Sequence, residues 1–206
     1  MAARDALVIV DVQNDFVSGT MKVPGAEAII GPINEMAAAS RNLIVATDWH
    51  PRGHISFASS HDGRQHGDFI EVAHGRQKLF HDHCVQGTWG AELDPRLRVE
   101  HAALVLRKGY HADLDSFSAF HWNDGATRTG LAGYLRDRGV ERVFVCGIAR
   151  LGCVLQSALG AAREGFETFF VDDASVGDAG RSEDECMALL AEAGVAVVRS
   201  GDLLKA

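Results

Sequence analysis

Short apolar runs rich in β-branched residues alternate with helix-like stretches along this chain, and this alternation restricts the fold more than any other feature. Strands that are apolar at every position are buried on both faces, and strands that alternate with helices form parallel sheets. We therefore predict an α/β fold, a three-layer α/β/α sandwich with a mostly parallel sheet. Strands are expected at Ala6–Val10, Leu43–Thr47, Ala103–Leu106, Arg142–Cys146, Thr168–Val171 and Val195–Val198, and helices at Glu27–Ala39, Thr129–Arg138, Cys153–Glu164 and Glu183–Ala193.

The organisation of the chain predicts a single domain over residues 1–206. The length is close to the ordinary size of one domain, and the chain has no internal repeat and no linker rich in Pro, Gly and Ser. One region, His50–Arg98, is far longer than an ordinary connection of up to about 12–15 residues. Because it holds seven of the ten histidines, we predict that it contributes to a functional site.

The charge balance argues against several classes of partner. The chain has 28 acidic and 20 basic residues, a net charge of −8, whereas nucleic-acid binding needs a basic face. The apolar run Ala6–Val10 is far shorter than the roughly 20 residues of a membrane span, and Arg4, Asp5 and Asp11 around it do not fit a secretory signal. No C-x-x-C pair is present, which argues against a redox or zinc-knuckle motif. A core of this size needs no disulfides, and without an export signal we expect reduced thiols and a cytoplasmic location. The oligomeric state stays open, a homo-oligomer included.

Four reactive side chains are predicted to meet at one edge of the sheet. Asp11 and Asp48 end the first two strands, Lys108 follows the third, and Cys153 opens the helix after the fourth. Ligands of such sheets bind outside the carboxyl ends of the strands. Each residue alone has an ordinary structural explanation, but their convergence favours a catalytic triad of Asp11, Lys108 and Cys153, with a thiol nucleophile, a carboxylate base and a cation.

The segment before Cys153 predicts how that thiol is activated. Residues 147–152 form a strand-to-helix elbow, which places the sulfur near a helix N-terminus, where backbone N–H groups lower a thiol's pKa. The N–H groups of Ala149 and Cys153 at this elbow could form an oxyanion hole. We therefore expect Cys153, rather than the other three cysteines, to be the reactive one.

A metal site is predicted beside the triad. Asp48 and His50 form a D-x-H triplet at a strand end, and His83 of the long loop completes a carboxylate–His₂ set with open positions. His54 is either a fourth ligand or a partner behind the ligands. The bound ion is expected to be divalent, zinc first, with iron and manganese as alternatives. The competing interpretation is that these are surface histidines of a polar loop.

Six segments of the chain, in order, match a known pattern. Over residues 7–175, the chain resembles the nicotinamidase/pyrazinamidase branch of the isochorismatase-like cysteine hydrolases. The matching segments are Asp11-Val-Gln-Asn-Asp-Phe16, Asp48-Trp-His-Pro, His54-Ile-Ser-Phe57, Asp82-His-Cys-Val-Gln86, Lys108-Gly109 and Asp115-Ser-Phe-Ser-Ala-Phe120.

The resemblance implies a function and a set of roles. It implies an amidase with an Asp–Lys–Cys triad and a divalent metal held by Asp48, His50 and His83, which binds the substrate's ring nitrogen and water. It also implies a cis peptide before Ala149 and a packing role for Phe16 against the substrate ring.

Two segments depart from the family pattern. Arg150-Leu151-Gly152 replaces the usual Thr-Asp-x at the elbow, and Phe80-His81 replaces Trp-Pro before the third metal ligand. Phe80 should leave more room in the pocket wall. If Arg150 points inward, it adds positive charge near the carbonyl of the substrate. These changes predict equal or better turnover of a larger or anionic carboxamide.

The sequence as a whole predicts a metal-containing cysteine amidohydrolase. It would convert nicotinamide, or a closely related small carboxamide, to the acid and ammonia through a thioester. One alternative is a hydrolase of the same fold that acts on a different amide, a ureido or a carbamoyl substrate. A second is a catalytically silent metal-binding protein, and a third uses a metal-bound water as the nucleophile.

Overall fold

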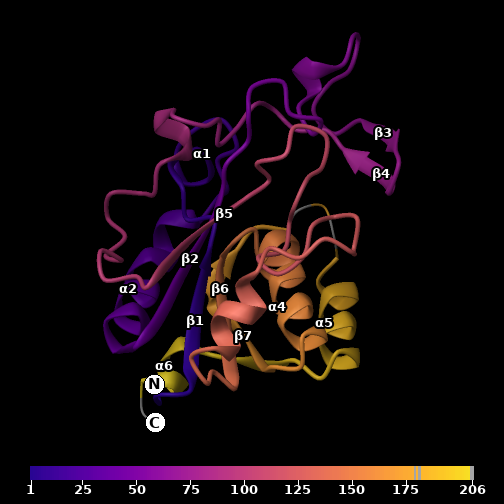
Figure 1. Cartoon of the computed structure of the whole chain (residues 1–206). Helices are drawn as coiled ribbons and strands as arrows, with labels where there is room; N and C mark the ends of the chain where they lie inside the picture. The colour runs from indigo at the N-terminus through magenta and orange to yellow at the C-terminus, as the bar shows by residue number, and fades with distance from the viewer. Residues whose placement is uncertain (179, 181, 205–206) are drawn as a thin grey trace.

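A six-stranded sheet runs through the molecule in the order β5-β2-β1-β6-β7-β8, and every neighbouring pair of strands is parallel (Figure 1). The computed structural model describes residues 1–178, 180 and 182–204. The predicted fold class is confirmed. The strands are β1 (Asp5–Val10), β2 (Asn42–Asp48), β5 (Leu104–Lys108), β6 (Arg142–Ile148), β7 (Glu167–Val176) and β8 (Ala196–Val198).

Helices cover both faces of the sheet and give it three layers. Ala6, Val8 and Val10 of β1 pack in one apolar cluster, while Leu7 and Ile9 pack in a second one, because successive side chains of a strand point to opposite faces. The first cluster includes residues of three helices, α3 (Leu131–Arg136), α4 (Leu155–Arg163) and α5 (Glu183–Glu192), and the second includes residues of α2 (Ile30–Ala39) and α6 (Ser200–Leu203).

Several predicted elements have different bounds in the structure. The predicted helix from Glu27 begins as a short 3-10 turn, η1 (Ala26–Ile29), before α2. The helix predicted from Cys153 begins at Leu155, after an irregular helical turn, η4 (Arg150–Val154). Strand β7 extends well past the predicted end at Val171.

The extra length of β7 is polar, which is why apolar patterning does not indicate it. Asp172 in this stretch pairs with Arg150, and Asp173 accepts hydrogen bonds from the backbone N–H (2.7 Å) and hydroxyl (2.9 Å) of Ser200 at the start of α6. The strand is therefore held by tertiary partners as well as by the sheet.

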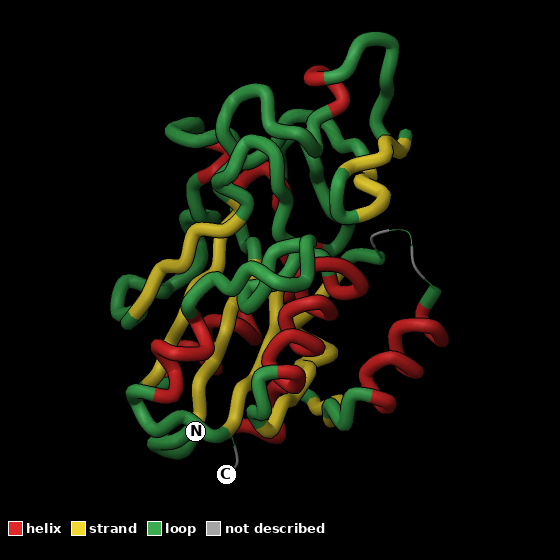
Figure 2. Tube along the Cα trace, turned by 45° about the vertical axis from the view of Figure 1, so that its right-hand side comes forward, coloured by secondary structure: helices red, strands yellow, loops and turns green. Residues whose placement is uncertain are grey.

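The long region after β2 forms a loop-rich cap over the carboxyl ends of the strands, at the opposite end of the molecule from the N-terminus (Figure 2). A two-stranded antiparallel hairpin stands at its outer side. The cap contains η2 (Ala58–Ser60), β3 (Phe69–Val72), β4 (Gly75–Lys78) and η3 (Trp89–Ala91), and the short α1 (Asn14–Val17) lies beneath it. No helix in the described part of the chain is long and apolar enough to cross a membrane.

Candidate active site and metal centre

The strand order brings the predicted triad together. Asp48 and Lys108 are paired in register at the ends of β2 and β5, and Asp11 directly follows β1 on the other side of β2. Strand β6, the next neighbour of β1, leads through Ala149 into the turn that carries Cys153. Parallel strands that end at one edge therefore place four chemically reactive groups side by side.

Lys108 is the centre of this group. Its Nζ atom lies 2.8 Å from Oδ2 of Asp11, 2.5 Å from Oδ1 of Asp48 and 3.7 Å from Sγ of Cys153, and it also donates to the carbonyl oxygen of Ser116 at 3.1 Å. The lysine side chain has no solvent exposure. A buried ammonium is stable only when paired and hydrogen-bonded, and two carboxylates meet that requirement here.

Burial and neighbouring charges set the protonation of the triad. Burial, together with the negative charge of Asp48, raises the pKa of Asp11 to about 7, although Lys108 opposes the shift. Burial lowers the pKa of Lys108, but Asp11 and Asp48 outweigh it and raise the pKa well above the usual value. Asp11 is thus a carboxyl group with a pKa close to neutrality, next to a buried cation.

The expected activation of Cys153 by a helix N-terminus is wrong for the substrate-free protein. Burial and the carboxylates of Asp11 and Asp48 raise the pKa of this thiol, and Lys108 only partly offsets them. The local helix argument omits these two carboxylates, which belong to other strands. The thiol therefore needs a base, and a carboxylate oxygen of Asp11 lies within 4.8 Å of its sulfur.

Asp48, His50 and His83 form a group that fits a divalent cation. Oδ2 of Asp48 lies 3.7 Å from Nε2 of His50 and 3.9 Å from Nε2 of His83, and all three residues are buried. One carboxylate oxygen and two imidazole nitrogens facing one point are the donors that zinc, iron and manganese accept. The second oxygen of Asp48 remains with Lys108.

Backbone carbonyls orient the two imidazoles. Nδ1–H of His50 donates to the carbonyl oxygen of Gly109 at 2.8 Å, and Nδ1–H of His83 donates to that of His81 at 2.7 Å. Because a carbonyl oxygen only accepts, Nδ1 carries a proton in both rings, and Nε2 is the atom that faces Asp48 and would bind a metal. Gly109 is required here, because its φ is +65° and a Cβ atom would lie 2.4 Å from Cε1 of His50.

The charges of Asp48 and His83 also suit metal binding. Burial lowers the pKa of His50, but Asp48 outweighs burial and raises that pKa, so a metal bound there would replace a proton. Burial raises the pKa of Asp48, but Lys108 and His50 outweigh it and hold the pKa well below its usual range, so the carboxylate stays ionised. Burial and the neighbouring His50 lower the pKa of His83 to about 4, which keeps that imidazole neutral. An ionised carboxylate and a neutral imidazole are the forms that bind metals.

His54 lies behind the metal-binding group. Its ring centroid is 4.2 Å from that of His50, its Nδ1 atom is 2.7 Å from the hydroxyl of Ser56, and its Nε2 atom is 3.4 Å from the carbonyl oxygen of Leu114. His54 also forms a second close group of potential ligands with His50 and Asp115. Whether it is a ligand stays a prediction.

The elbow after β6 has the implied backbone form but not the expected charge. The peptide between Ile148 and Ala149 is cis, and the N–H groups of Gly152 and Val154 both donate to the carbonyl oxygen of Ala149. Arg150 does not point into the pocket. Its guanidinium pairs with Asp172 of β7 and Glu183 of α5, so the condition for a positive charge near the substrate carbonyl is not met.

A cavity of about 910 Å³ opens over Cys153 and the metal-binding group. Ala149 and Cys153 lie in its wall, as do the predicted substrate contacts Phe16 and Phe80. The ring centroid of Phe16 lies 5.5 Å from that of His83, and the rings of Phe80 and Phe117 meet edge to face at 6.3 Å. The aromatic walls could hold a planar ring between the metal-binding group and the thiol.

Two supporting contacts were not predicted from the sequence. The side chain of Gln13 accepts from the N–H of Asp48 and donates to the carbonyl oxygens of Asp48 and Ala91. Asp115 accepts from the N–H of Ser116, whose carbonyl oxygen binds Lys108. A buried Gln two positions after Asp11 was the available signal for the first contact; nothing in local patterning indicates the second.

Comparisons with known proteins place these features in a family. The isochorismatase domain model matches residues 5–202. A nicotinamidase of Acinetobacter baylyi is 46% identical over 170 residues, which cover 82% of this chain and 79% of the relative. These matches confirm the resemblance to the nicotinamidase/pyrazinamidase branch.

Solved structures agree with the sequence matches. The structure of the nicotinamidase and pyrazinamidase of Acinetobacter baumanii has a TM-score of 0.96 and 44% identity, covering 99% of this chain and 100% of that one. The pyrazinamidase of Pyrococcus horikoshii in complex with zinc has a TM-score of 0.78 and 31% identity, covering 95% and 99% of the two chains. The chain belongs to the isochorismatase domain family.

Proposed function

We propose that this protein is a cysteine amidohydrolase that converts nicotinamide, or a closely related small carboxamide, to the acid and ammonia. The observation that carries the proposal is the contact of the buried Lys108 ammonium with both Asp11 and the Cys153 sulfur. Cys153 itself lies in the wall of a cavity that the metal-binding group also lines. The 46% identity to a nicotinamidase supports the choice of substrate class.

The first step of the mechanism forms the nucleophile. Asp11, with a pKa of about 7, accepts the proton of the Cys153 thiol as the sulfur attacks the carbonyl carbon of the carboxamide. The thiol pKa is raised in the resting protein, so attack and proton transfer occur together rather than from a free thiolate. Lys108, at 3.7 Å from the sulfur, stabilises the negative charge that develops there.

The tetrahedral intermediate places a negative charge on the former carbonyl oxygen. The N–H groups of Ala149 and Cys153 at the elbow would hold this oxyanion; fixed donors of this kind contribute about 3–4 kcal/mol each to the lowering of a barrier. Collapse of the intermediate breaks the carbon–nitrogen bond, and Asp11 returns its proton to the leaving ammonia.

The second half of the reaction releases the acid. Asp11, deprotonated again, takes a proton from a water molecule that attacks the thioester carbonyl carbon. The carbon–sulfur bond breaks, the proton returns to Cys153, and the carboxylic acid leaves. One carboxyl group therefore acts as base and acid in both halves, which is consistent with a pKa near neutrality.

The metal-binding group has a role in substrate binding. Asp48, His50 and His83 would hold a divalent cation, with zinc the first candidate and iron and manganese as alternatives. A bound cation would supply a Lewis acid that anchors the substrate's ring nitrogen and a water molecule. Phe16 and Phe80 would contact the two sides of the ring, and we propose them as the substrate-binding residues.

The proposal is tested by ammonia release across a panel of carboxamides, with metal analysis of the same sample. We expect turnover of nicotinamide by the metal-loaded protein and none by Cys153→Ala, whose folding should be intact by circular dichroism. Mass spectrometry of a rapidly quenched reaction should find an acyl group on Cys153. Substantial turnover by Cys153→Ala would exclude the cysteine mechanism and favour a water nucleophile.

A further inference from the structure

The cavity is larger than a single carboxamide ring needs. Its volume of about 910 Å³ is near the upper end of the roughly 300–1,000 Å³ found for sites that bind drug-sized ligands. Its inner wall consists of buried residues such as Asp48, His50 and Phe16, whereas its outer wall contains exposed residues. A substrate that fills the inner part leaves the outer part free for a substituent.

Cationic side chains dominate this outer part. Lys22, Arg76 and Lys78 line it, and Asp178 is the one carboxylate among its exposed described residues. The side chain of Asp178 accepts a hydrogen bond from the N–H of Gly180. The chain as a whole carries a net charge of −8, so a local excess of positive charge is unusual for it.

Lys78 is the best placed of these cations. It is partly buried, and its Nζ atom has no carboxylate within 4.0 Å among the described residues. Arg76, by contrast, stacks on Phe69 at 4.5 Å and lies 3.7 Å from the exposed Glu71. An ammonium that has no carboxylate partner in the described part of the chain, at the wall of a cavity, is available to an anionic ligand.

The position of Lys78 connects the outer part to the catalytic part. Its Nζ atom lies 5.9 Å from the ring centroid of Phe80, and the Phe80 ring lies 5.8 Å from that of His83. The same ammonium lies beside the segment after β7, since a Cβ atom on Gly180 would be 3.2 Å from it. Lys78 thus reaches from β4 to the opposite wall of the cavity, outward from the metal-binding group.

We propose that the outer part of this cavity binds an anionic substituent of the substrate, a carboxylate or a phosphate, through Lys78 with support from Lys22 and Arg76. The inference rests on the proposed amidase function and names its substrate class: ring carboxamides with a negatively charged arm that points away from the amide. Lysine binds such groups as a point charge, so both kinds of anion fit.

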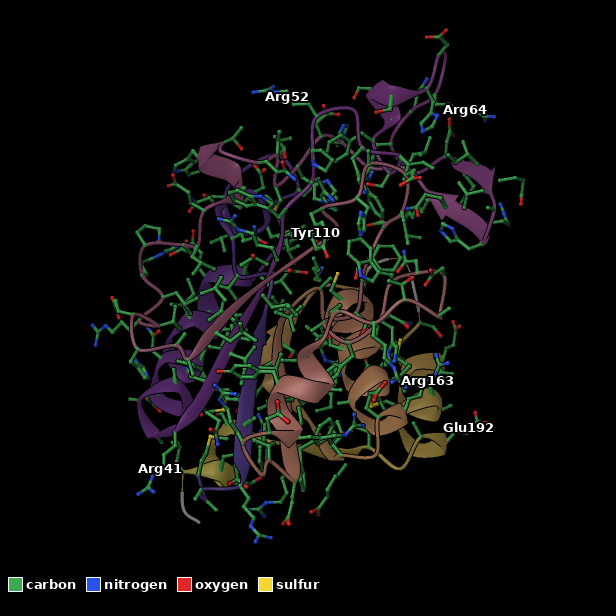
Figure 3. All side chains as sticks on the ribbon, viewed as in Figure 1. Arg41, Arg52, Arg64, Tyr110, Arg163 and Glu192 are labelled. Carbon is green, nitrogen blue, oxygen red and sulfur yellow. The ribbon has the colours of Figure 1, made fainter. Side chains whose placement is uncertain are left out.

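The test compares charged and neutral substrates of one shape. The probes are nicotinamides that carry a carboxymethyl or a phosphonomethyl group at the ring position that is meta to both the carboxamide and the ring nitrogen. Each is paired with its neutral ester, the methyl ester of the carboxylate or the dimethyl ester of the phosphonate. The readout is the ratio of kcat/KM for the anionic probe to kcat/KM for its ester, in the wild type, Lys78→Met and Arg64→Met. Arg64 is the matched control, because it lies on the outer end of the same cap and does not line the cavity (Figure 3).

We expect the wild type to prefer at least one anionic probe, with the ratio reduced about tenfold in Lys78→Met and unchanged in Arg64→Met. Raising the ionic strength should reduce the preference in the wild type. The carboxymethyl and phosphonomethyl arms then show which anion is favoured. A ratio near one in the wild type, or one that Lys78→Met leaves unchanged, would overturn the inference while nicotinamide turnover still supports the proposed function.

If no probe is hydrolysed, binding measurements test the anion site separately from the proposed amidase function. Calorimetry on Cys153→Ala measures the affinity for each anionic probe and its ester without turnover. If the anionic probe binds more tightly than its ester, and Lys78→Met abolishes this difference, the anion site is supported even if the protein is not an amidase. Equal affinities for the anionic and neutral probes reject it.

Discussion

The Nζ atom of Lys108 lies 2.5 Å from Oδ1 of Asp48, so one ion pair joins the proposed triad to the proposed metal-binding group. Lys108 is also 2.8 Å from Asp11, and none of the three side chains is more than slightly exposed. In the described part of the chain, no other lysine or arginine lies within 4.0 Å of the carboxylate of Asp11 or Asp48. We therefore expect the lysine to serve stability as well as the proposed catalysis.

Lys108→Met should remove activity and destabilise the fold. The substitution leaves two buried carboxylates without their cation, and breaking a buried pair in this way costs about 3–5 kcal/mol. Urea unfolding measures the loss, and Lys22→Met, an exposed lysine, is the control with an expected change below about 0.5 kcal/mol. An unfolding free energy within 1 kcal/mol of the wild type would contradict the account.

The pH dependence of activity should report Asp11. This carboxyl must be ionised to accept the thiol proton, and its pKa is about 7, so kcat/KM should rise with pH through neutrality and fall about tenfold per unit below it.

The contribution of Asp11 to the free energy of unfolding should change with pH in the opposite direction. The raised pKa means that the folded protein binds this proton more tightly than the unfolded chain, so the contribution of Asp11 increases as pH falls from about 7 toward 3.8.

Acid inactivation by this route is therefore distinct from unfolding. A pH–rate profile with parallel circular dichroism separates the two processes, and Asp11→Asn should remove turnover at every pH. A kcat/KM that does not change with pH across neutrality would mean that the ionisation of Asp11 does not control the activity of the free enzyme.

The metal should serve binding more than bond cleavage, because the thiol already supplies the nucleophile. His50→Ala or chelation should lower metal content and activity together. Cys153 should still react with iodoacetamide, since its contacts with Lys108 and Asp11 do not involve His50. Cys153 is also the cysteine that is not fully buried. Mass spectrometry locates the label; loss of alkylation along with the metal would show that the thiol site is not preformed.

Gly109→Ala tests the orientation of His50. A Cβ atom at this position would lie 2.4 Å from Cε1 and 2.7 Å from Nδ1 of the imidazole, so the ring must move. Disturbing the partner of a metal-binding histidine typically costs about 10–100-fold in metal affinity. Gly125→Ala is the matched control, since Gly125 has a similar φ of +69° and a Cβ there meets nothing within 4 Å. Equal zinc affinity in the two variants would exclude the proposed role of Gly109.

The sequence predicts the arrangement of Asp11, Asp48 and Lys108 because the carboxyl ends of parallel strands meet at one edge, and strand periodicity is a local signal. It does not predict the hairpin of β3 and β4. The apolar residues of β3 are exposed or half-buried rather than in the core, and β4 has no large apolar side chain. Lys78, which we propose binds an anionic substituent in the outer part of the cavity, belongs to that hairpin. Its role is therefore indicated by the structure and not by the sequence pattern.

The protonation of Cys153 and the direction of Arg150 fail for a common reason. The turn that carries both residues indicates a helix N-terminus next to the thiol and a cation near the substrate. The groups that decide the outcome are distant in sequence: Asp11 and Asp48 act on the thiol, and Asp172 and Glu183 bind the arginine. Sequence reasoning brings Asp11 and Asp48 to the same sheet edge as Cys153 but does not weigh their charges against the helix N-terminus. It does not pair Arg150 with either of its partners.

The direction of Arg150 leads to a specific expectation for the elbow. Its side chain is 16% exposed and paired with two carboxylates outside the cavity, while Leu151 is buried in the core. Arg150→Thr should therefore leave the preference among nicotinamide, ring-substituted nicotinamides and acidic amides unchanged. It should cost stability modestly, about 1 kcal/mol, because both carboxylate partners are half exposed and screened by solvent. Measuring kcat/KM for the panel together with urea unfolding checks both parts. A shift of preference away from acidic amides in this variant would mean that Arg150, and not the cations at the mouth, interacts with the substrate's charge.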